Sequence, residues 1–276
     1  MTTPPTPRRR GLASAAWRIA LATTALGTCV AAGAAVLPAG DPSDTAVLMA
    51  RIAFGVAISA LMVGLIAVLA RRADRETLRG IGVTTNRVDW RLALWGAAVW
   101  TVPAAAAFGV LALLGAPLTV TVSAAELART GLLLLFAVLV VEAVPEEVVF
   151  RGYVTTVLGR VTRGWWIIVV QALLFTLFAG LLRQNWNPLD LSLFVTMGIG
   201  FGYLRMLTGS VWMPIGFHAA FQTGAQLILA HDAVEFAGGT GAAMLALGAV
   251  PFSVAAVLVT AAGVPRSVAA TPGGTD

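Results

Sequence analysis

The stretch LARTGLLLLFAVLVVEAVPEEVVFRGYV, residues 127–154, decides the fold class of this chain. Its first part is an unbroken apolar run from Leu132 to Val141, and its second part carries four Glu and Arg residues. A helix of about 20 mostly apolar residues spans the roughly 30 Å hydrocarbon core of a bilayer. The stretch therefore predicts a transmembrane helix over about 127–150.

The composition extends this interpretation to the whole chain of 276 residues. Only 11% of the residues are Asp, Glu, Lys or Arg, against about 25% in a typical soluble domain, and 58% are hydrophobic. So few charges could not cover a water-soluble globule of this size, and the surrounding solvent must be a lipid bilayer. The positive residues are all Arg and are dispersed between apolar runs, so we expect no nucleic-acid partner.

Eight apolar runs, each of about 20 residues, predict an all-α, polytopic membrane bundle of about eight transmembrane helices. They lie near 19–37, 47–70, 92–115, 127–150, 164–182, 189–207, 211–230 and 241–263. The first also fits a signal peptide, but a retained helix is expected because the run is long enough to span and more spans follow. The expected organisation is a disordered basic arm over 1–16, a single bundle over 17–263 and a disordered tail over 264–276.

The distribution of Arg predicts how the chain is oriented. If the N-terminus is inside, fifteen of the eighteen Arg residues fall on the inner side and only Arg51, Arg129 and Arg183 on the outer side. The positive-inside rule places Arg-rich loops in the cytoplasm. The absence of Lys and the abundance of Ala, Val and Arg indicate a GC-rich bacterial genome. We therefore expect a multi-pass protein of the inner (plasma) membrane with both termini cytoplasmic.

Charged residues within these apolar runs are candidates for function, because each costs about 2.5–3.5 kcal/mol on insertion scales. Glu142 and Glu146 are four residues apart, as are Glu147 and Arg151, so on a helix each pair shares a face. Pro145 removes a backbone donor just before the acidic pair, which opens or kinks the helix. The alternative is a helix end at the interface, with solvated carboxylates and a snorkelling Arg.

The second candidate is His218, with Gln222 four residues later on the same helical face. A lone His among apolar residues is often a hydrogen-bonded core residue, but this one follows Pro214 and Gly216, which loosen the start of its helix. A carboxylate and an imidazole in a low-dielectric cavity suit the activation of water, and His218 with Gln222 could donate to an oxyanion. This combination indicates hydrolysis of a peptide bond.

Two of these segments resemble the CPBP intramembrane proteases, the CAAX-protease and bacteriocin-processing group also called Abi. EEVVFRG, residues 146–152, is similar to the first family motif, Glu-Glu-x-x-x-Arg. GFGYLRMLTGSVWMPIGFHAAFQ, residues 200–222, resembles the region of the third motif, His-x-x-x-Asn or Asp, with Gln222 at its last position. In the second motif, Phe-x-x-x-His, Phe175 matches but Ala179 stands at the histidine. The resemblance covers about 142–222 and implies a CPBP-like core over about 127–230.

The resemblance implies a role for each matched residue. Glu146 would activate water, Glu147 and Arg151 would order the site, and His218 with Gln222 would stabilise the oxyanion. The family also implies a divalent metal such as Zn, with Glu146 and His218 as the candidate ligands. Ala179 can neither bind metal nor activate water, and a catalytic zinc site usually has three protein ligands.

Three functions follow from this reading. The first is an intramembrane endopeptidase acting on membrane-bound proteins or peptides. The second is a non-enzymatic relative, a membrane binding or immunity protein in which Ala179 has ended hydrolysis. The third is a transporter with a buried proton-relay carboxylate, which the intramembrane Glu cluster alone would permit.

Overall fold

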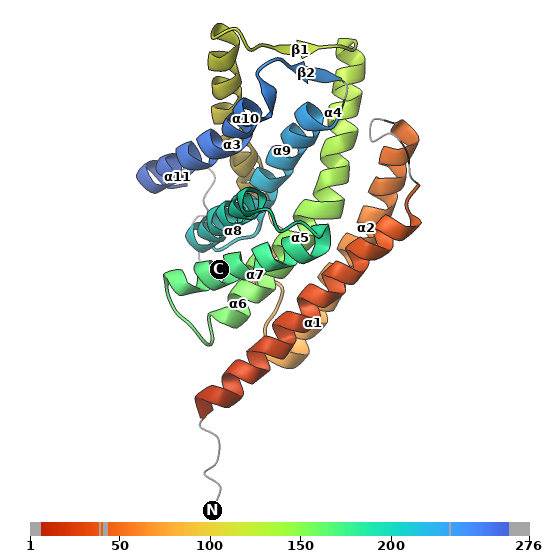
Figure 1. The fold of residues 1–276 in the computed structure, drawn as a ribbon. Coiled ribbons are helices and arrows are strands. Elements are labelled where there is room, and N and C mark those ends of the chain that lie inside the picture. Colours follow the sequence, from red (N-terminus) through yellow and green to blue (C-terminus); the bar gives the residue numbers. More distant parts are fainter. Residues whose placement is uncertain (1–6, 39, 41–43, 232, 265–276) are drawn as a thin grey trace, which may run out of the picture. The chain divides into compact units, whose positions relative to one another are not determined.

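The structure, a computed structural model, describes residues 7–38, 40, 44–231 and 233–264 (Figure 1). Over these residues it is almost entirely helical, and seven helical segments are long and apolar enough to cross a membrane. They are Gly11–Val36, Thr45–Asp74, Arg87–Leu113, Ala124–Leu158, Trp165–Arg183, Pro188–Thr208 and Gly239–Ala262. Large apolar side chains such as Leu61, Leu94 and Leu132 lie exposed along them, as lipid-facing positions require. The prediction of a polytopic helical membrane protein is confirmed.

The remaining expected span, 211–230, is helix α9 (Trp212–Leu229). It is helical over 18 residues but falls outside the set of apolar candidate spans. The physical reason is its polar content, because His218, Gln222 and Gln226 all lie within it. Much of α9 is buried against other helices, so it needs less apolar surface than a lipid-facing span.

Helix α1 (Pro7–Val36) begins earlier than the sequence predicts. Residues 11–16, expected in the disordered arm, are helical because they are mostly good helix formers, and Ala15 is buried. Residues 1–6 of the predicted arm and all but the first residue of the predicted tail lie outside the described residues.

The chain divides into two compact units, each assembled from separate stretches. Unit 1 comprises 1–36, 58–84 and 145–211, and unit 2 comprises 37–57, 85–144 and 212–276. The unit boundary near residue 144 separates Glu142 from Glu146. The single bundle expected over 17–263 stays a prediction, because each unit is defined by its own internal contacts.

Unit 1 is built around helices α7 (Trp165–Arg183) and α8 (Pro188–Thr208), which pack along each other and contact the helical segment that follows Pro145. Gly198 and Gly202 make this close approach possible. A Cβ atom at Gly198 would lie 2.7 Å from Cα of Ala172, and one at Gly202 would lie 2.9 Å from Oε1 of Gln171. Small residues at such a spacing let membrane helices approach closely.

Unit 2 is organised around the contact of α3 (Arg87–Leu113) with α9. At Gly96 of α3 a Cβ atom would overlap the backbone carbonyl of Met213, and at Gly216 of α9 it would overlap that of Ala93. The two backbones therefore touch directly, which places α9 in the interior of the unit. Around them pack α4 (Ala124–Val138), α11 (Val250–Ala262) and the π-helical segment η4 (Leu245–Ala249), which follows α10 (Gly239–Met244).

Two prolines in unit 2 and at its boundary follow π-helical turns. The π-helical segment η2 (Leu139–Ala143) precedes Pro145, and η4 (Leu245–Ala249) precedes Pro251. Proline has no N–H, and its ring clashes with the carbonyl four residues earlier. A widened turn accommodates both effects without ending the helix. The kink expected at Pro145 is therefore a local widening of a continuous helical segment.

A short antiparallel ribbon completes unit 2. Strand β1 (Leu118–Val120) pairs with β2 (Val234–Phe236), with Thr119 opposite Glu235. The ribbon joins the loop after α3 to the loop after α9. No alternating pattern in the sequence indicated strands this short.

Candidate active site

The Glu-Glu-x-x-x-Arg motif lies in a helical segment that alternates between α-helical and π-helical winding. After η2 come one short α-helical turn, α5 (Val144–Glu147), then the π-helical segment η3 (Val148–Val154) and α6 (Thr155–Leu158). Glu146 and Glu147 occupy the short turn and Arg151 lies in η3. π-Helical turns occur frequently at functional sites because they displace side chains from the regular helical positions.

Glu147 and Arg151 form a fully buried ion pair. The Arg151 guanidinium Nη1 donates to Oε1 of Glu147 at 3.0 Å, and both side chains are 0% exposed. The guanidinium also lies over the rings of Phe175, at 4.4 Å from the ring centroid, and Phe201, at 5.0 Å. Aromatic faces attract a cation, more strongly where water is excluded. The prediction that these two residues pair is confirmed, and the interfacial alternative is wrong for Arg151 and Glu147 because neither is exposed.

Arg151 also connects the motif segment to α8 through hydrogen bonds. Its Nη2 donates to the backbone carbonyl of Met197 at 3.4 Å, and its own carbonyl accepts from Nε of Arg205 at 3.1 Å. Glu146, on the short turn beside Glu147, is only partly buried. It is close enough to interact electrostatically with Arg151. Unit 1 thus holds one carboxylate locked by the guanidinium and a second, adjacent carboxylate that remains accessible.

The buried face of α7 carries the second-motif positions. Phe175 and Ala179 are both buried, and the Phe175 ring packs edge-on against Phe150 at 5.1 Å. Ala179 offers only a methyl group where the family pattern has a histidine. Gln171, one turn before Phe175, is 0% exposed, and neither its Oε1 nor its Nε2 has a hydrogen-bond partner within the described part of the chain. The only sequence signal for Gln171 is a lone amide in an otherwise apolar run.

The third-motif residues lie on α9 in unit 2. His218 is 1% exposed, and Gln222 lies one turn further along the helix. Nε2 of Gln222 donates to Oε2 of Glu142 at 2.9 Å, and Nε2 of Gln226 donates to Oε1 of the same carboxylate at 3.0 Å. Glu142, whose role the sequence leaves open, therefore holds the amide of Gln222.

Arg51 completes this polar cluster from α2 (Thr45–Leu69). Its Nη2 lies 3.4 Å from Oε1 of Gln226 and 3.7 Å from Oε1 of Glu142, and the Arg51 and Glu142 side chains are each 20% exposed. Sequence reasoning assigns Arg51 to the outer side and gives Gln226 no role. The available signals were an Arg inside an apolar run and a second amide four residues after Gln222.

The structure thus brings the predicted site residues together in two groups. Unit 1 holds Glu146, Glu147 and Arg151, and unit 2 holds His218 and Gln222. His231, the other histidine, lies in the loop after α9 and is buried.

The donor set does not fit the metal site that the family implies. Among the described residues, no three His, Cys, Asp or Glu side chains gather as ligands for an ion. A catalytic zinc normally has three protein ligands, and Glu147 is already bound to Arg151. The described residues therefore supply no set of three ligands that includes either Glu146 or His218.

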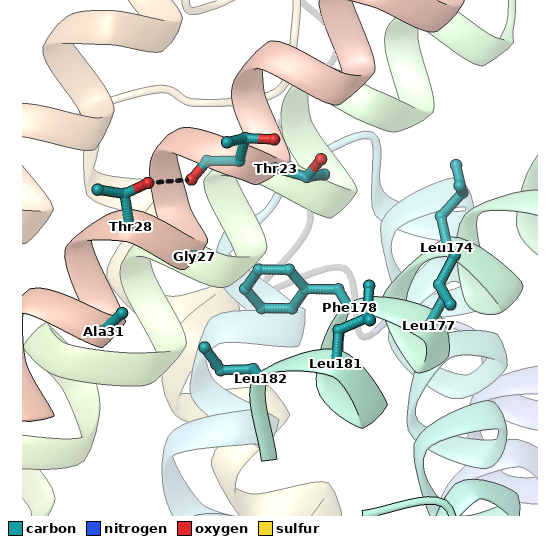
Figure 2. A pocket seen from close by; sticks show the side chains of 10 residues that line it. Thr23, Gly27, Thr28, Ala31, Leu174, Leu177, Phe178, Leu181 and Leu182 are labelled. Atoms are coloured by element: carbon teal, nitrogen blue, oxygen red, sulfur yellow. Dashed lines mark hydrogen bonds between the residues drawn. The ribbon is translucent and has the colours of Figure 1, made fainter. Parts of the chain in front are cut away.

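Each unit also contains an apolar groove. In unit 1 a groove of about 430 Å³ runs between α1 and α7, with Gly27 of α1 facing the ring of Phe178 (Figure 2). In unit 2 an apolar groove of about 780 Å³ is lined by α3, α4 and α9, including Trp90, Leu135 and Ile215. Asp89 and Arg87 line the same groove at the start of α3.

Comparison with known proteins gives one match. The search of curated proteins found no match to the chain, and the search of solved structures found none either. Residues 128–224 match the family model described as "Type II CAAX prenyl endopeptidase Rce1-like". The matched segment runs from α4 to α9 and contains Glu146, Glu147, Arg151, His218 and Gln222. Over these residues, about a third of the chain, the protein is similar to the CPBP family of membrane-embedded endopeptidases, to which this family model belongs.

Proposed function

We propose that this protein is an intramembrane endopeptidase that hydrolyses peptide bonds of membrane-associated proteins or peptides, with Glu146 activating the water. The observation that carries the proposal is the family match over 128–224, since it covers both motif segments in one continuous stretch. The protein would lie in the bacterial inner membrane with both termini in the cytoplasm.

The contacts in unit 1 support different roles for the two adjacent carboxylates. Glu147 is fixed by Arg151 in a fully buried pair, so it orders the turn that carries its neighbour. Glu146 is only partly buried and can reach water. A partly buried carboxylate beside such a pair can accept a proton from water as the water attacks a carbonyl carbon. That proton then passes to the amine as the peptide C–N bond breaks.

The oxyanion role falls to His218 and Gln222. An imidazole N–H and an amide N–H are suitable donors to the charge that develops on the carbonyl oxygen. Gln222 already donates one N–H to Glu142, and its amide nitrogen has a second. The hydrogen bond to Glu142 therefore orients the Gln222 amide and leaves its second N–H for the oxyanion.

A specific observation favours a second candidate, a family member that binds membrane proteins without cleaving them. Ala179 provides no functional group at the second-motif position, and no metal-binding group of three occurs among the described residues. Such a protein would keep the fold and the buried pair and lack hydrolysis.

The deciding experiment is N- and C-terminal peptide mapping of membrane proteins from cells that express wild type, Glu146→Gln or Glu126→Gln. Glu126 is the matched control, because it is an exposed carboxylate at the start of the same spanning segment. The protease proposal predicts new termini with wild type and Glu126→Gln and none with Glu146→Gln, at equal protein levels in the membrane. Identical termini in all samples would refute it and favour the binding protein. An Ala179→His variant would then report whether that position alone had ended cleavage.

A further inference from the structure

A polar cavity of about 590 Å³ lies where the loop 159–164 joins α6 to α7 in unit 1. The loop contributes Arg160, Thr162 and Arg163, α1 contributes Leu12, and α7 contributes Trp166. The described residues that line it include two guanidinium groups and no carboxylate. The loop connects two candidate membrane spans, Ala124–Leu158 and Trp165–Arg183, so the cavity lies at a membrane surface.

A buried polar network fixes one wall of this cavity. Nη1 of Arg160 lies 3.1 Å from Oδ1 of Asp74, and its Nη2 donates to the Asp74 carbonyl at 2.9 Å. The Asp74 carboxylate is itself buried, bonded to Arg18 and to the hydroxyl of Tyr153 at 2.8 Å. Arg160 is therefore held in place from the protein side while 37% of its side chain remains exposed. A donor that is already ordered loses little entropy when a ligand binds.

Arg163 supplies the charge that this network does not neutralise. Arg160 faces Asp74 and Glu76, so much of its charge is offset. Arg163 is exposed, and the described residues provide it with no ion pair. Two guanidinium groups with one unneutralised charge favour an anion with several oxygen acceptors, such as a phosphate.

The rim of the cavity is apolar, and the binding of a soluble phosphate ion would not require an apolar rim. Leu12 is 50% exposed and Trp166 is 66% exposed. The adjacent Trp165 stacks on Tyr203 with ring centroids 5.7 Å apart. Trp and Tyr collect at the level of lipid headgroups, where their rings contact the upper acyl chains. The cavity thus combines a phosphate-binding wall with an apolar edge that opens toward lipid.

From this combination we propose that the cavity binds the phosphate group of an anionic phospholipid, at a site distinct from the candidate active site. The phosphate lies between Arg160 and Arg163, and the start of the acyl chains lies against Leu12 and Trp166. Each Arg near a membrane surface contributes about 1 kcal/mol to the binding of anionic lipid, which corresponds to about a fivefold change in affinity.

The test uses the purified full-length protein in a mild detergent with added phosphatidylglycerol, phosphatidylcholine or inorganic phosphate. Binding is measured by native mass spectrometry and by the shift in Tm. Arg163→Gln is compared with Arg183→Gln, because Arg183 is an exposed Arg at the far end of helix α7, which begins just after the loop that carries Arg163. Equal Tm values without lipid would establish that both variants are folded.

We expect phosphatidylglycerol to bind and raise the Tm of wild type and Arg183→Gln, and Arg163→Gln to bind it about fivefold more weakly. Three results would overturn the proposal. Equal lipid binding by the two variants would mean that the cavity at Arg163 does not bind the lipid. Equal binding of phosphatidylcholine would remove the requirement for an anionic headgroup. An equal Tm shift from inorganic phosphate would assign the cavity to a soluble phosphate.

Discussion

The buried pair between Glu147 and Arg151 makes a sharp prediction about stability. Glu147→Gln removes the negative charge but keeps the size of the side chain, so Arg151 stays in the interior as an unpaired cation. At the observed 3.0 Å, two unit charges attract each other by about 5–6 kcal/mol if the effective dielectric constant is about 20. The neutral amide recovers part of this through a hydrogen bond.

The expected loss in the free energy of unfolding is about 3–5 kcal/mol, the usual cost of removing one partner of a buried pair. The rings of Phe175 and Phe201 cannot compensate, because a cation over an aromatic face gains only about 0.5–2 kcal/mol and both contacts already exist. In contrast, the double variant Glu147→Gln with Arg151→Met leaves no buried charge. It should be more stable than Glu147→Gln alone.

The measurement is reversible unfolding in mixed micelles of a mild detergent and dodecyl sulfate, followed by the loss of helical circular dichroism. Glu76→Gln is the control, because Glu76 pairs with Arg160 at 3.4 Å while the two side chains are 40% and 37% exposed. An exposed pair of this kind contributes about 0–1 kcal/mol. If Glu147→Gln lost no more stability than Glu76→Gln, or if the double variant were the least stable of all, the buried-pair reasoning would be refuted.

Three further predictions concern unit 2 and use the same unfolding measurement. Gly96→Ala should lose at least about 1–3 kcal/mol, because its methyl group would overlap a backbone carbonyl of α9, whereas Gly109→Ala on the same helix has open space and should lose nothing; equal effects would contradict the direct backbone contact. Trp100→Phe removes the buried 3.0 Å bond from Nε1 to the carbonyl of Leu247, and a loss of about 1–3 kcal/mol is expected; an unchanged stability would mean that the bond contributes nothing. Asn86→Ala removes the capping box at the start of α3 and should lose about 0.5–2 kcal/mol, while Asn86→Asp retains most of it; a full loss with Asp would point to a role other than capping.

Within the candidate site, prediction from sequence succeeded where the partners are local. The pairing of Glu147 with Arg151 follows from a four-residue spacing, and it survives although Arg151 lies in a π-helical turn. The close packing at Gly198 and Gly202 follows from a local pattern in the same way. In both cases the interacting atoms are fixed by a few residues of one helix, so little depends on the rest of the chain.

Prediction failed where a polar group meets partners from distant segments. The carboxylate of Glu142 is held by Gln222 and Gln226 of α9 and lies near Arg51 of α2, and no local spacing joins these residues. The sequence assigns no role to Gln171, because one amide in an apolar run does not indicate whether it is buried. The expected metal ligands were assigned by motif alone, and the described donor set does not support a metal.

The sequence by itself determined that this chain is embedded in a lipid bilayer. It also determined roughly which residues form the spans and which segment carries the family motif. Those properties depend on apolar content over about 20 residues and on short spacings, which are local in the chain. Only the tertiary structure decided that α9 is an interior helix of its unit, that Glu142 orients Gln222, and that Asp74 anchors Arg160 beside a polar cavity of about 590 Å³. These features depend on which helices pack together, and packing is set by contacts between segments as much as 175 residues apart, as for Arg51 and Gln226.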